Sequence, residues 1–236
     1  MTRFVVATRN AHKTEEIRAI LGGRFQYLTL GDFPDAPRTV EDADTFAGNA
    51  TKKAIELAQW LARRSTLGLR SSGLLVLADD SGLEVDALQG APGVYSARFA
   101  AGEGAAAQSA NFANTADSDN NAKLIRLLDG VPWERRTARF RCVLALTPVF
   151  REAPATASPV CYAEECELQT ELFEGACEGG IGFEPRGQGG FGYDPLFIPE
   201  GYEQSFAELG EDIKNNISHR ARALSKLGES LRTEQR

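Results

Sequence analysis

The chain has 236 residues, of which 25% are charged and 42% hydrophobic, and its formal net charge is −7. This composition is close to that of an average soluble domain, which excludes a fibrous or disordered chain, and the acidic balance argues against broad binding to nucleic acid or anionic lipid. The first ten residues reach a polar loop too soon for a signal peptide, and no apolar run approaches membrane-spanning length, so we expect a cytoplasmic protein.

The first part of the chain alternates strand and helix signals. A short β-branched and aromatic run predicts a strand over residues 3–8, and apolar residues at helical spacing predict a helix over 11–21 that a glycine pair ends. A second apolar face predicts a helix over 45–60. A basic loop over 63–73 then leads to a buried strand over 74–78.

The second part begins with turn signals and returns to strands and helices. The expected elements are, in order, a turn-rich region over 79–99, a helix over 122–128, a strand over 137–150, an exposed hairpin tip over 151–159, a strand over 161–177 and a helix over 218–231. Without a repeat or a linker, this mixture predicts a single α/β or α+β domain. The cysteines lack the paired CxxC spacing of a zinc site, so we expect reduced, mostly structural thiols: Cys142, Cys161, Cys166 and Cys177.

The first stretch with chemical potential is ATRNAHKTEE, residues 7–16. A strand that ends at Thr8 and a helix that begins near Asn10 bring free backbone N–H groups and the positive end of a helix dipole to one spot, which attracts phosphate. Lys13, which Glu16 would orient, is unfavourable in a first helical turn unless an anion lies beside it. The alternative is an ordinary asparagine cap with a solvated lysine, and the spacing leaves the two readings about even.

A second stretch, LLVLADDSGLEVDAL, takes a buried strand directly into Asp79 and Asp80. The end of a strand in an open α/β sheet is the usual place for a site. Neighbouring strand residues face opposite ways, so both carboxylates meet one ligand only if the backbone turns, and Ser81-Gly82 is expected to supply that turn. One carboxylate would then hold Mg²⁺ and activate water. The alternative is that the pair only begins a hairpin turn.

Two further pairs of charges surround the second predicted helix. Glu41 and Asp42 precede it in a polar loop and are candidate metal ligands, while Lys52 and Lys53 lie within it and are candidate phosphate contacts. Taken by themselves, such charges are more often simply solvated.

A third region combines GGFGYDPLF, residues 189–197, with the later stretch NNISHRARAL. Aromatic rings in a loop do little for stability unless they pack inward or present a face to a ligand. Ser218 is a candidate N-cap that places His219 and Arg220 in a first helical turn, where the arginine fork matches carbonyl oxygens on a flat ring. The alternatives are core packing for the aromatics and a surface salt bridge for Arg220.

Six motifs, taken in order, resemble those of the inosine triphosphate pyrophosphatase, or Ham1-like, family over nearly the whole chain. They are TRNAHKTEE, TFAGNATKKA, LADDSGLEVDALQGAPGVYSARF, RTARFRCVLAL, GGFGYDPLF and ISHRARAL. The resemblance implies an α/β fold with a long, curved mixed sheet flanked by helices. It also implies one domain over residues 1–236, with two lobes and a central cleft, usually in a homodimer. The implied reaction is Mg²⁺-dependent hydrolysis of ITP, dITP and XTP between the α and β phosphates, which removes these noncanonical purine nucleotides from the pool.

The same resemblance assigns residue roles. Asp80 would be the general base and a metal ligand with Glu41, and Lys13 would be catalytic. The triphosphate would be held by Thr8, Arg9, Asn10, Ala11, His12, Lys13, Lys53 and Ser81. The base pocket would consist of Phe191, Gly192, Tyr193, Asp194, Lys214, His219 and Arg220.

The expected base selectivity has a physical reason. Hypoxanthine and xanthine carry a carbonyl oxygen at position 6 where adenine carries an amino group, so donors from His219 or Arg220 would be left unpaired against adenine. A buried unpaired donor costs about 1–3 kcal/mol. The sequence does not show which group rejects guanine.

The chain departs from the family pattern at several places. Arg9 replaces a common glycine and would add a phosphate contact or narrow the cleft. In the loop that usually carries a metal-binding glutamate followed by glycine, Ala43 stands in the glycine's place, so the metal ligand is Glu41 or a neighbour. The segments 63–73 and 151–165 are longer than usual and are expected to be surface elaborations.

Three other classes compete with this reading. Maf-like pyrophosphatases share the fold and reaction, but SHR with GFGYD favours the purine branch. A nucleotide-binding regulator without catalysis has no need of the combination of Lys13, Lys53 and Asp80. A nucleic-acid-binding module is disfavoured by the acidic charge and the lack of a basic stripe.

Overall fold

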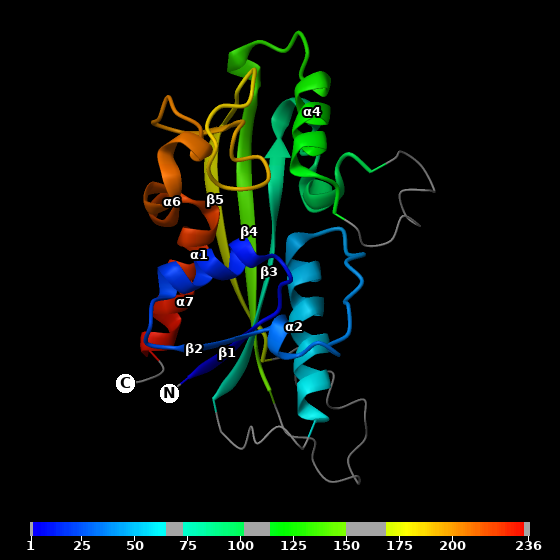
Figure 1. The fold of residues 1–236 in the computed structure, drawn as a ribbon, viewed down its shortest axis with the longest axis vertical. Coiled ribbons are helices and arrows are strands. Elements are labelled where there is room, and N and C mark those ends of the chain that lie inside the picture. Colours follow the sequence, from blue (N-terminus) through cyan, green and yellow to red (C-terminus); the bar gives the residue numbers. More distant parts are fainter. Residues whose placement is uncertain (1, 65–72, 102–113, 150–168, 234–236) are drawn as a thin grey trace. The chain divides into compact units, whose positions relative to one another are not determined.

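The computed structural model describes residues 2–64, 73–101, 114–149 and 169–233, which form a six-stranded sheet with helices beside it (Figure 1). The strand order is β2-β1-β3-β4-β5-β6. The sheet is mixed, because β1 is parallel to both neighbours and β5 is antiparallel to β6. The strands are β1 (Arg3–Val6), β2 (Gln26–Thr29), β3 (Leu74–Val85), β4 (Thr137–Pro148), β5 (Glu171–Ile181) and β6 (Phe197–Pro199). The predicted α/β fold with a mixed sheet is therefore confirmed.

The described helices fall between and after these strands. The α-helices are α1 (Ala11–Leu21), α2 (Phe46–Ala62), α4 (Asp117–Leu127), α6 (Phe206–Ile217) and α7 (His219–Thr233). Short 3-10 helices are η1 (Leu30–Asp32), η2 (Asp86–Leu88), η3 (Gly93–Arg98) and η4 (Trp133–Arg135). No helix among the described residues is both long and apolar enough to cross a membrane.

The chain divides into two compact units. The first unit comprises Met1–Asp80, Val143–Glu174 and Ala223–Arg236, and the second comprises Ser81–Cys142 and Gly175–Arg222. This division does not test the prediction of one domain over residues 1–236, which stays a prediction.

The first unit is organised around β1. Val5 pairs with Leu28 of β2 on one side and with Val76 of β3 on the other, and it is fully buried. A central parallel strand is covered on both faces, which explains the continuous apolar run rather than an alternating one. The buried face of α2 follows the helical period and consists of Phe46, Asn49, Ala50, Ala54, Leu57, Ala58 and Leu61.

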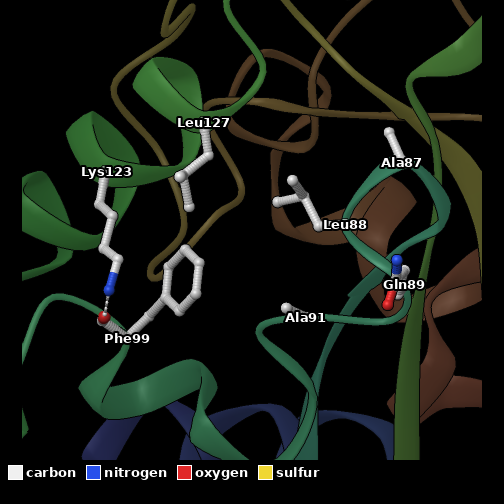
Figure 2. A pocket seen from close by; sticks show the side chains of 7 residues that line it. All are labelled: Ala87, Leu88, Gln89, Ala91, Phe99, Lys123 and Leu127. Carbon is white, nitrogen blue, oxygen red and sulfur yellow. Dashed lines mark hydrogen bonds between the residues drawn. The ribbon is translucent and has the colours of Figure 1, made fainter. Parts of the chain in front are cut away.

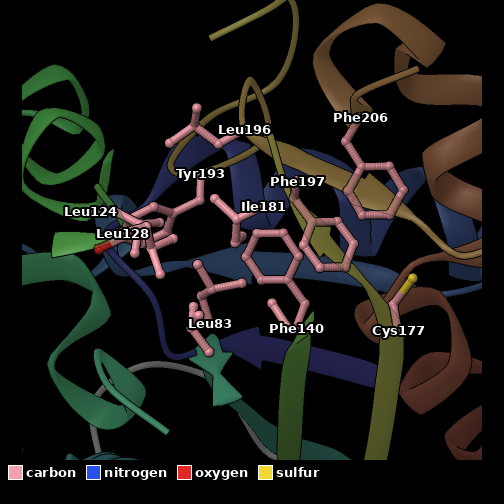
Figure 3. Close-up of a cluster of buried hydrophobic side chains, with 12 residues drawn as sticks. Leu83, Leu124, Leu128, Phe140, Cys177, Ile181, Tyr193, Leu196, Phe197 and Phe206 are labelled. Carbon is pink, nitrogen blue, oxygen red and sulfur yellow. The ribbon is translucent and has the colours of Figure 1, made fainter. Parts of the chain in front are cut away.

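The core of the second unit is rich in aromatic rings (Figure 3). The ring of Phe197 lies 4.7 Å from Phe140 and 5.3 Å from Phe206, measured between centroids. Leu124 and Tyr193 belong to the same cluster, so α4 and the loop that precedes β6 share this core. Such ring pairs add to the stability gained from burial alone.

Several predicted elements are confirmed, because their signals are local. Helix α1 has the predicted bounds, with Gly22 at its C-terminus, and α2, β4 and α7 lie within a few residues of their predicted ranges. Ser218 caps α7 as expected, since its Oγ accepts a hydrogen bond from the Ala221 N–H at 3.2 Å.

The predicted turn at Ser81-Gly82 is wrong. Strand β3 runs without a break from Leu74 to Val85, and Leu83 is fully buried in the core of the second unit. The DDSG sequence is typical of a turn, but lysines from elsewhere in the chain neutralise its two carboxylates and allow them to stay in a buried strand.

Other boundaries also differ from expectation. Helix α4 begins at Asp117 rather than at residue 122, and acidic residues in its first turn suit the helix dipole. Strand β5 begins at Glu171 and continues to Ile181. Helix α6 was not predicted, although Ser205 and Glu208 form a capping box at its start.

Some predictions fall where the structure gives no description. The hairpin tip over 151–159, the start of the strand predicted over 161–177, Cys161 and Cys166 all lie outside the described residues, as does most of the 63–73 loop. The other two cysteines are buried thiols, and burial raises the pKa of Cys177 to about 11.

Candidate functional site

The N-terminus of α1 is shaped by its own polar side chains. Asn10 is the N-cap, because its Oδ1 accepts a hydrogen bond from the Lys13 N–H at 3.3 Å, and Thr8 Oγ1 accepts one from the Asn10 N–H at 3.2 Å. First-turn N–H groups of a helix have no intrahelical partner, and they attract anions together with the dipole. The asparagine cap and the potential anion site therefore coexist.

Lys13 is held by a carboxylate of β3. Its Nζ lies 2.5 Å from Oδ1 of Asp79, whose side chain is fully buried, and the lysine side chain itself is only 15% exposed. The alternative of a solvated lysine is wrong. The sequence singled out Asp79 together with Asp80, but the resemblance assigned a role only to Asp80.

Lys53 connects two further carboxylates. Its Nζ lies 2.8 Å from Asp80 Oδ1 and 3.3 Å from Glu41 Oε2, and it also donates to the Asp79 carbonyl oxygen at 2.8 Å. By contrast, Lys52 makes a more exposed ion pair with Asp42 at 2.6 Å. The structure thus separates two adjacent lysines that charge patterning alone left equivalent, and it is Lys53, the one that the resemblance assigned to the triphosphate, that joins the buried carboxylates. We call the five residues of the first unit Lys13, Glu41, Lys53, Asp79 and Asp80 the charge cluster.

The groups of the charge cluster shift one another's pKa values. Burial raises the pKa of Asp80, and the nearby Glu41 carboxylate adds to that rise against the opposing effect of Lys53 and Lys13. For Glu41, burial is outweighed by Lys53 and Lys13, so its pKa is lowered. For Lys53, burial is outweighed by Asp80 and Glu41, so its pKa is raised. Two closely placed carboxylates therefore share the positive charge of two lysines.

The cluster has a feature suited to a hard cation. Oδ2 of Asp80 is buried and has no hydrogen-bond partner among the described residues. A buried anionic oxygen is costly without a donor or a cation beside it. The described residues contain no group of three or more histidine, cysteine or acidic side chains arranged for a metal. Two carboxylates, with phosphate and water oxygens completing the shell, are a common way for proteins to bind Mg²⁺, so Asp80 and Glu41 fit such an ion.

The loop that holds Glu41 is fastened by Asn49, a residue that sequence reasoning missed. Asn49 is fully buried, its Oδ1 accepts from the Ala43 N–H at 3.0 Å and its Nδ2 donates to the Ala43 carbonyl oxygen at 3.3 Å. The available signal was an asparagine on the apolar face of a helix, where a buried amide needs partners.

The second unit contains the predicted base-binding residues. In the loop over residues 189–194, which we call the aromatic loop, Oδ2 of Asp194 accepts from the Phe191 N–H at 2.8 Å and from Lys214 Nζ at 2.5 Å. The Asp194 and Lys214 side chains are almost fully buried. The Phe191 ring is half-buried and lies 4.4 Å from Lys214 Nζ and 5.9 Å from Arg220 Cζ.

The two aromatic residues of this loop differ in their surroundings. Tyr193 is buried in the core, and its hydroxyl donates to the Ser96 carbonyl oxygen at 2.9 Å, so the core-packing alternative describes this ring. Burial raises the pKa of the Tyr193 phenol. Phe191 instead lies near two cations and keeps part of its surface exposed, which suits a stacking partner for a flat ring.

The SHR motif is buried. Arg220 is 1% exposed and donates to Ser81 Oγ at 2.9 Å, so the alternative of a surface salt bridge is wrong. The His219 ring stacks on Phe140 with centroids 4.8 Å apart and an interplanar angle of 13°. Both residues belong to the second unit, as do Ser81 and the aromatic loop.

Glycines in the aromatic loop have a structural reason of their own. Gly190 has a φ of +73°, and a Cβ on it would lie 2.2 Å from Asp194 Oδ2. Gly192 has a φ of +64°, which other residues rarely adopt. The loop needs both glycines for its own geometry, and a close approach to a base stays a prediction.

The remaining predicted phosphate contacts are near the surface. Arg9 is exposed and donates to the Ala36 carbonyl oxygen at 3.2 Å, and His12 is exposed with its Nδ1 3.9 Å from Glu15. Ala11 lies beside them in the first turn of α1.

A separate pocket of about 300 Å³ lies in the second unit (Figure 2). Lys123 lies at its edge and donates to the Phe99 carbonyl oxygen at 2.7 Å. None of the lining residues is among the predicted site residues: Ala87, Leu88, Gln89, Ala91, Phe99, Lys123 and Leu127. We base the candidate site on the charge cluster and the aromatic loop, because these contain the groups suited to phosphate and to a base.

The fold is that of an α/β protein with a mixed sheet, and its charge cluster at a helix N-terminus is the kind of site that binds phosphate. The chain belongs to the Ham1 family, whose family model matches residues 4–230.

Relatives and solved structures agree with this membership. A dITP/XTP pyrophosphatase of Desulforamulus reducens is 45% identical, with 97% of this chain and 95% of the relative covered, and one of Geobacter sulfurreducens is 46% identical, with 98% and 97% covered. A HAM1 protein structure from Coxiella burnetii has a TM-score of 0.72 and 32% identity, covering 99% of this chain and 100% of its own.

Proposed function

We propose that this protein hydrolyses ITP, dITP and XTP to the nucleoside monophosphate and pyrophosphate, and so removes noncanonical purine nucleotides from the nucleotide pool. The proposal is supported by relatives named dITP/XTP pyrophosphatases that match almost the whole chain at 45% and 46% identity. The observation that carries it is the charge cluster, in which Lys53 is paired with Asp80 and Lys13 with the neighbouring Asp79, while Asp80 Oδ2 remains without a hydrogen-bond partner among the described residues.

The charge cluster would bind the triphosphate and activate water. Lys13 and Lys53 would neutralise phosphate oxygens, and the first-turn N–H groups of α1 would donate to them. Asp80 and Glu41 would hold Mg²⁺, which when bound supplies charge neutralisation on the phosphate oxygens. Asp80 would take the proton of a water that attacks the α-phosphorus, with pyrophosphate as the leaving group.

The aromatic loop and the SHR motif would select the base. Phe191 would stack on the purine, and Arg220 or His219 would donate to the oxygen at position 6. Adenine would leave such a donor unpaired, at a cost of about 1–3 kcal/mol. These roles place base recognition in residues of the second unit and phosphate chemistry in residues of the first.

The resemblance also supports a homodimer built from one domain per chain. Light scattering coupled to size exclusion tests this directly, and a monomer mass under the assay conditions would contradict it.

The function is tested with a panel of nucleoside triphosphates and Mg²⁺ in water labelled with ¹⁸O. We expect pyrophosphate from ITP, dITP and XTP, with the label in the monophosphate, because the attack is at the α-phosphorus. Orthophosphate as the product would contradict the mechanism. Binding without any product would favour a nucleotide-binding regulator, and turnover restricted to other nucleotides would favour a Maf-like activity.

A further inference from the structure

Both backbone groups of Gly192, at the centre of the aromatic loop, are held by side chains of α4. The Gly192 N–H donates to Asp117 Oδ2 at 2.6 Å, and the Gly192 carbonyl oxygen accepts from Asn121 Nδ2 at 3.0 Å. Asp117 and Asn121 are four residues apart on the helix, so they lie on one face, one turn apart. The two bonds therefore clamp a single peptide segment from both ends.

Helix α4 is itself fixed to the segment after η3. Oδ1 of Asn120 accepts from the Ala100 N–H at 2.7 Å, and Lys123 Nζ donates to the Phe99 carbonyl oxygen at 2.7 Å. Leu124 of α4 lies in the core cluster with Tyr193, the residue that follows Gly192 (Figure 3). The helix thus shares a buried core with the aromatic loop and makes two hydrogen bonds to it.

We propose that Asp117 and Asn121 are positioning residues for purine binding, which act by fixing Gly192 and thereby the Phe191 ring. This inference rests on the proposed function. Gly192 has a φ of +64°, and apart from its chain neighbours no atom lies within 4 Å of the place where a Cβ would be, so nothing packs against that side of the residue. The hydrogen bonds from α4 supply that restraint instead.

The restraint matters because Phe191 is the half-buried ring of the loop. Its own N–H is bound by Asp194, which fixes one side of the residue, and the Gly192 N–H bound by Asp117 belongs to the peptide on its other side. Loss of the Asp117 bond frees that peptide to rotate and moves the ring away from Lys214 and Arg220. The bond is exposed, but a hydrogen bond that a backbone N–H donates to a carboxylate is stronger than one between neutral groups, so its loss has a measurable effect.

The test compares Asp117→Ala, Asp117→Asn and Asp119→Ala in the full chain. Asp119 is exposed and lies in the same first turn of α4, so its substitution removes an equal helix-dipole contribution and serves as a matched control. We expect Asp117→Ala to raise KM for dITP about 5- to 20-fold with kcat changed less than about 2-fold. Asp117→Asn keeps an acceptor oxygen and should restore most of the affinity.

Inhibition by pyrophosphate separates positioning of the base from general damage. Pyrophosphate binds only phosphate-binding groups, so its inhibition constant should be the same in Asp117→Ala and wild type. The melting temperature should lie within a few degrees of that of Asp119→Ala, since one hydrogen bond is lost. Asn121→Ala should raise KM in the same direction. Asn121 is buried, so the KM of Asn121→Ala is interpreted only if this variant unfolds cooperatively. If it does not, the test rests on Asp117→Ala alone.

Several results would overturn the clamp. These are a KM for Asp117→Ala equal to that of Asp119→Ala, a parallel rise of KM and of the pyrophosphate inhibition constant, or a fall in kcat at unchanged KM. If the wild type releases no pyrophosphate, the proposed function fails, and calorimetric binding of dITP then judges the clamp: weaker binding by Asp117→Ala supports it, and equal or absent binding overturns it.

Discussion

The charge cluster of the first unit and the aromatic loop of the second differ in the contacts that hold them in place. In the cluster, side chains bind one another, as in the pairs of Lys13 with Asp79 and of Lys53 with Asp80. In the aromatic loop, side chains bind the backbone, as Asp194 and Asp117 do at two successive N–H groups. A substitution in the cluster therefore leaves a charged partner unpaired, which lowers both stability and catalysis. A substitution in the loop changes the position of the Phe191 ring.

The largest effect is expected from Asp80→Asn. The amide keeps the shape and can still accept from Lys53, but it is no base and a poor ligand for Mg²⁺, so kcat for dITP should fall by about 10²–10⁴-fold. Pyrophosphate release measures this. Asp42→Asn is the control, because Asp42 is an exposed carboxylate paired with Lys52. Equal activity of the two variants would remove Asp80 from the mechanism.

Lys53→Met should have the next largest effect. The substitution removes the hydrogen bonds to Asp80 and to the Asp79 carbonyl oxygen, and bonds to charged groups contribute about 1.5–3 kcal/mol each. We expect a lower free energy of unfolding in urea together with a fall in kcat/KM. Lys52→Met, one position earlier, should change neither by much, because its ion pair is more exposed. Similar losses of stability and kcat/KM in both variants would show that the buried contacts of Lys53 matter no more than the exposed ion pair of Lys52.

Phe191→Ala tests the aromatic loop with a smaller expected effect. Stacking of a base on an aromatic ring contributes about 1–3 kcal/mol, so KM for ITP should rise by about 5- to 100-fold while stability changes little. Phe183→Ala is the control, because Phe183 is 59% exposed and packs against Arg136. An unchanged KM for ITP, together with unchanged relative use of ATP, would place the base elsewhere.

The smallest effect is expected at Gly48, which adjoins the loop that carries Glu41. A Cβ on Gly48 would lie 2.7 Å from the Cβ of Ala43, so Gly48→Ala should displace the loop that carries Glu41 at a cost of about 1–3 kcal/mol. In an Ala43→Gly background the same change should cost less, because only the 3.1 Å approach to Thr45 Oγ1 remains and alanine favours a helix by about 1 kcal/mol over glycine. Urea unfolding of the four variants gives the coupling energy, and strict additivity would refute the contact.

Local signals account for the parts of the fold that the sequence predicts well. Asn10 and Gly22 mark both ends of α1, and Ser218 marks the start of α7, because capping depends on neighbours within a few residues. The same reasoning failed at Ser81-Gly82, where a turn signal lies inside β3. Pairing with other strands and burial of Leu83 outweighed the local preference there.

The sequence by itself determined the family, the order of motifs and the residue types that phosphate and purine chemistry require. Only the tertiary structure decided the partners: Lys13 is 66 residues from Asp79, and Lys53 is 27 residues from Asp80. The same holds for the contacts of Asp117 and Asn121 with Gly192, which span 75 and 71 residues. The reason is physical, because charges and amides far apart in a chain acquire defined partners only when folding buries them and makes an unpaired polar group costly.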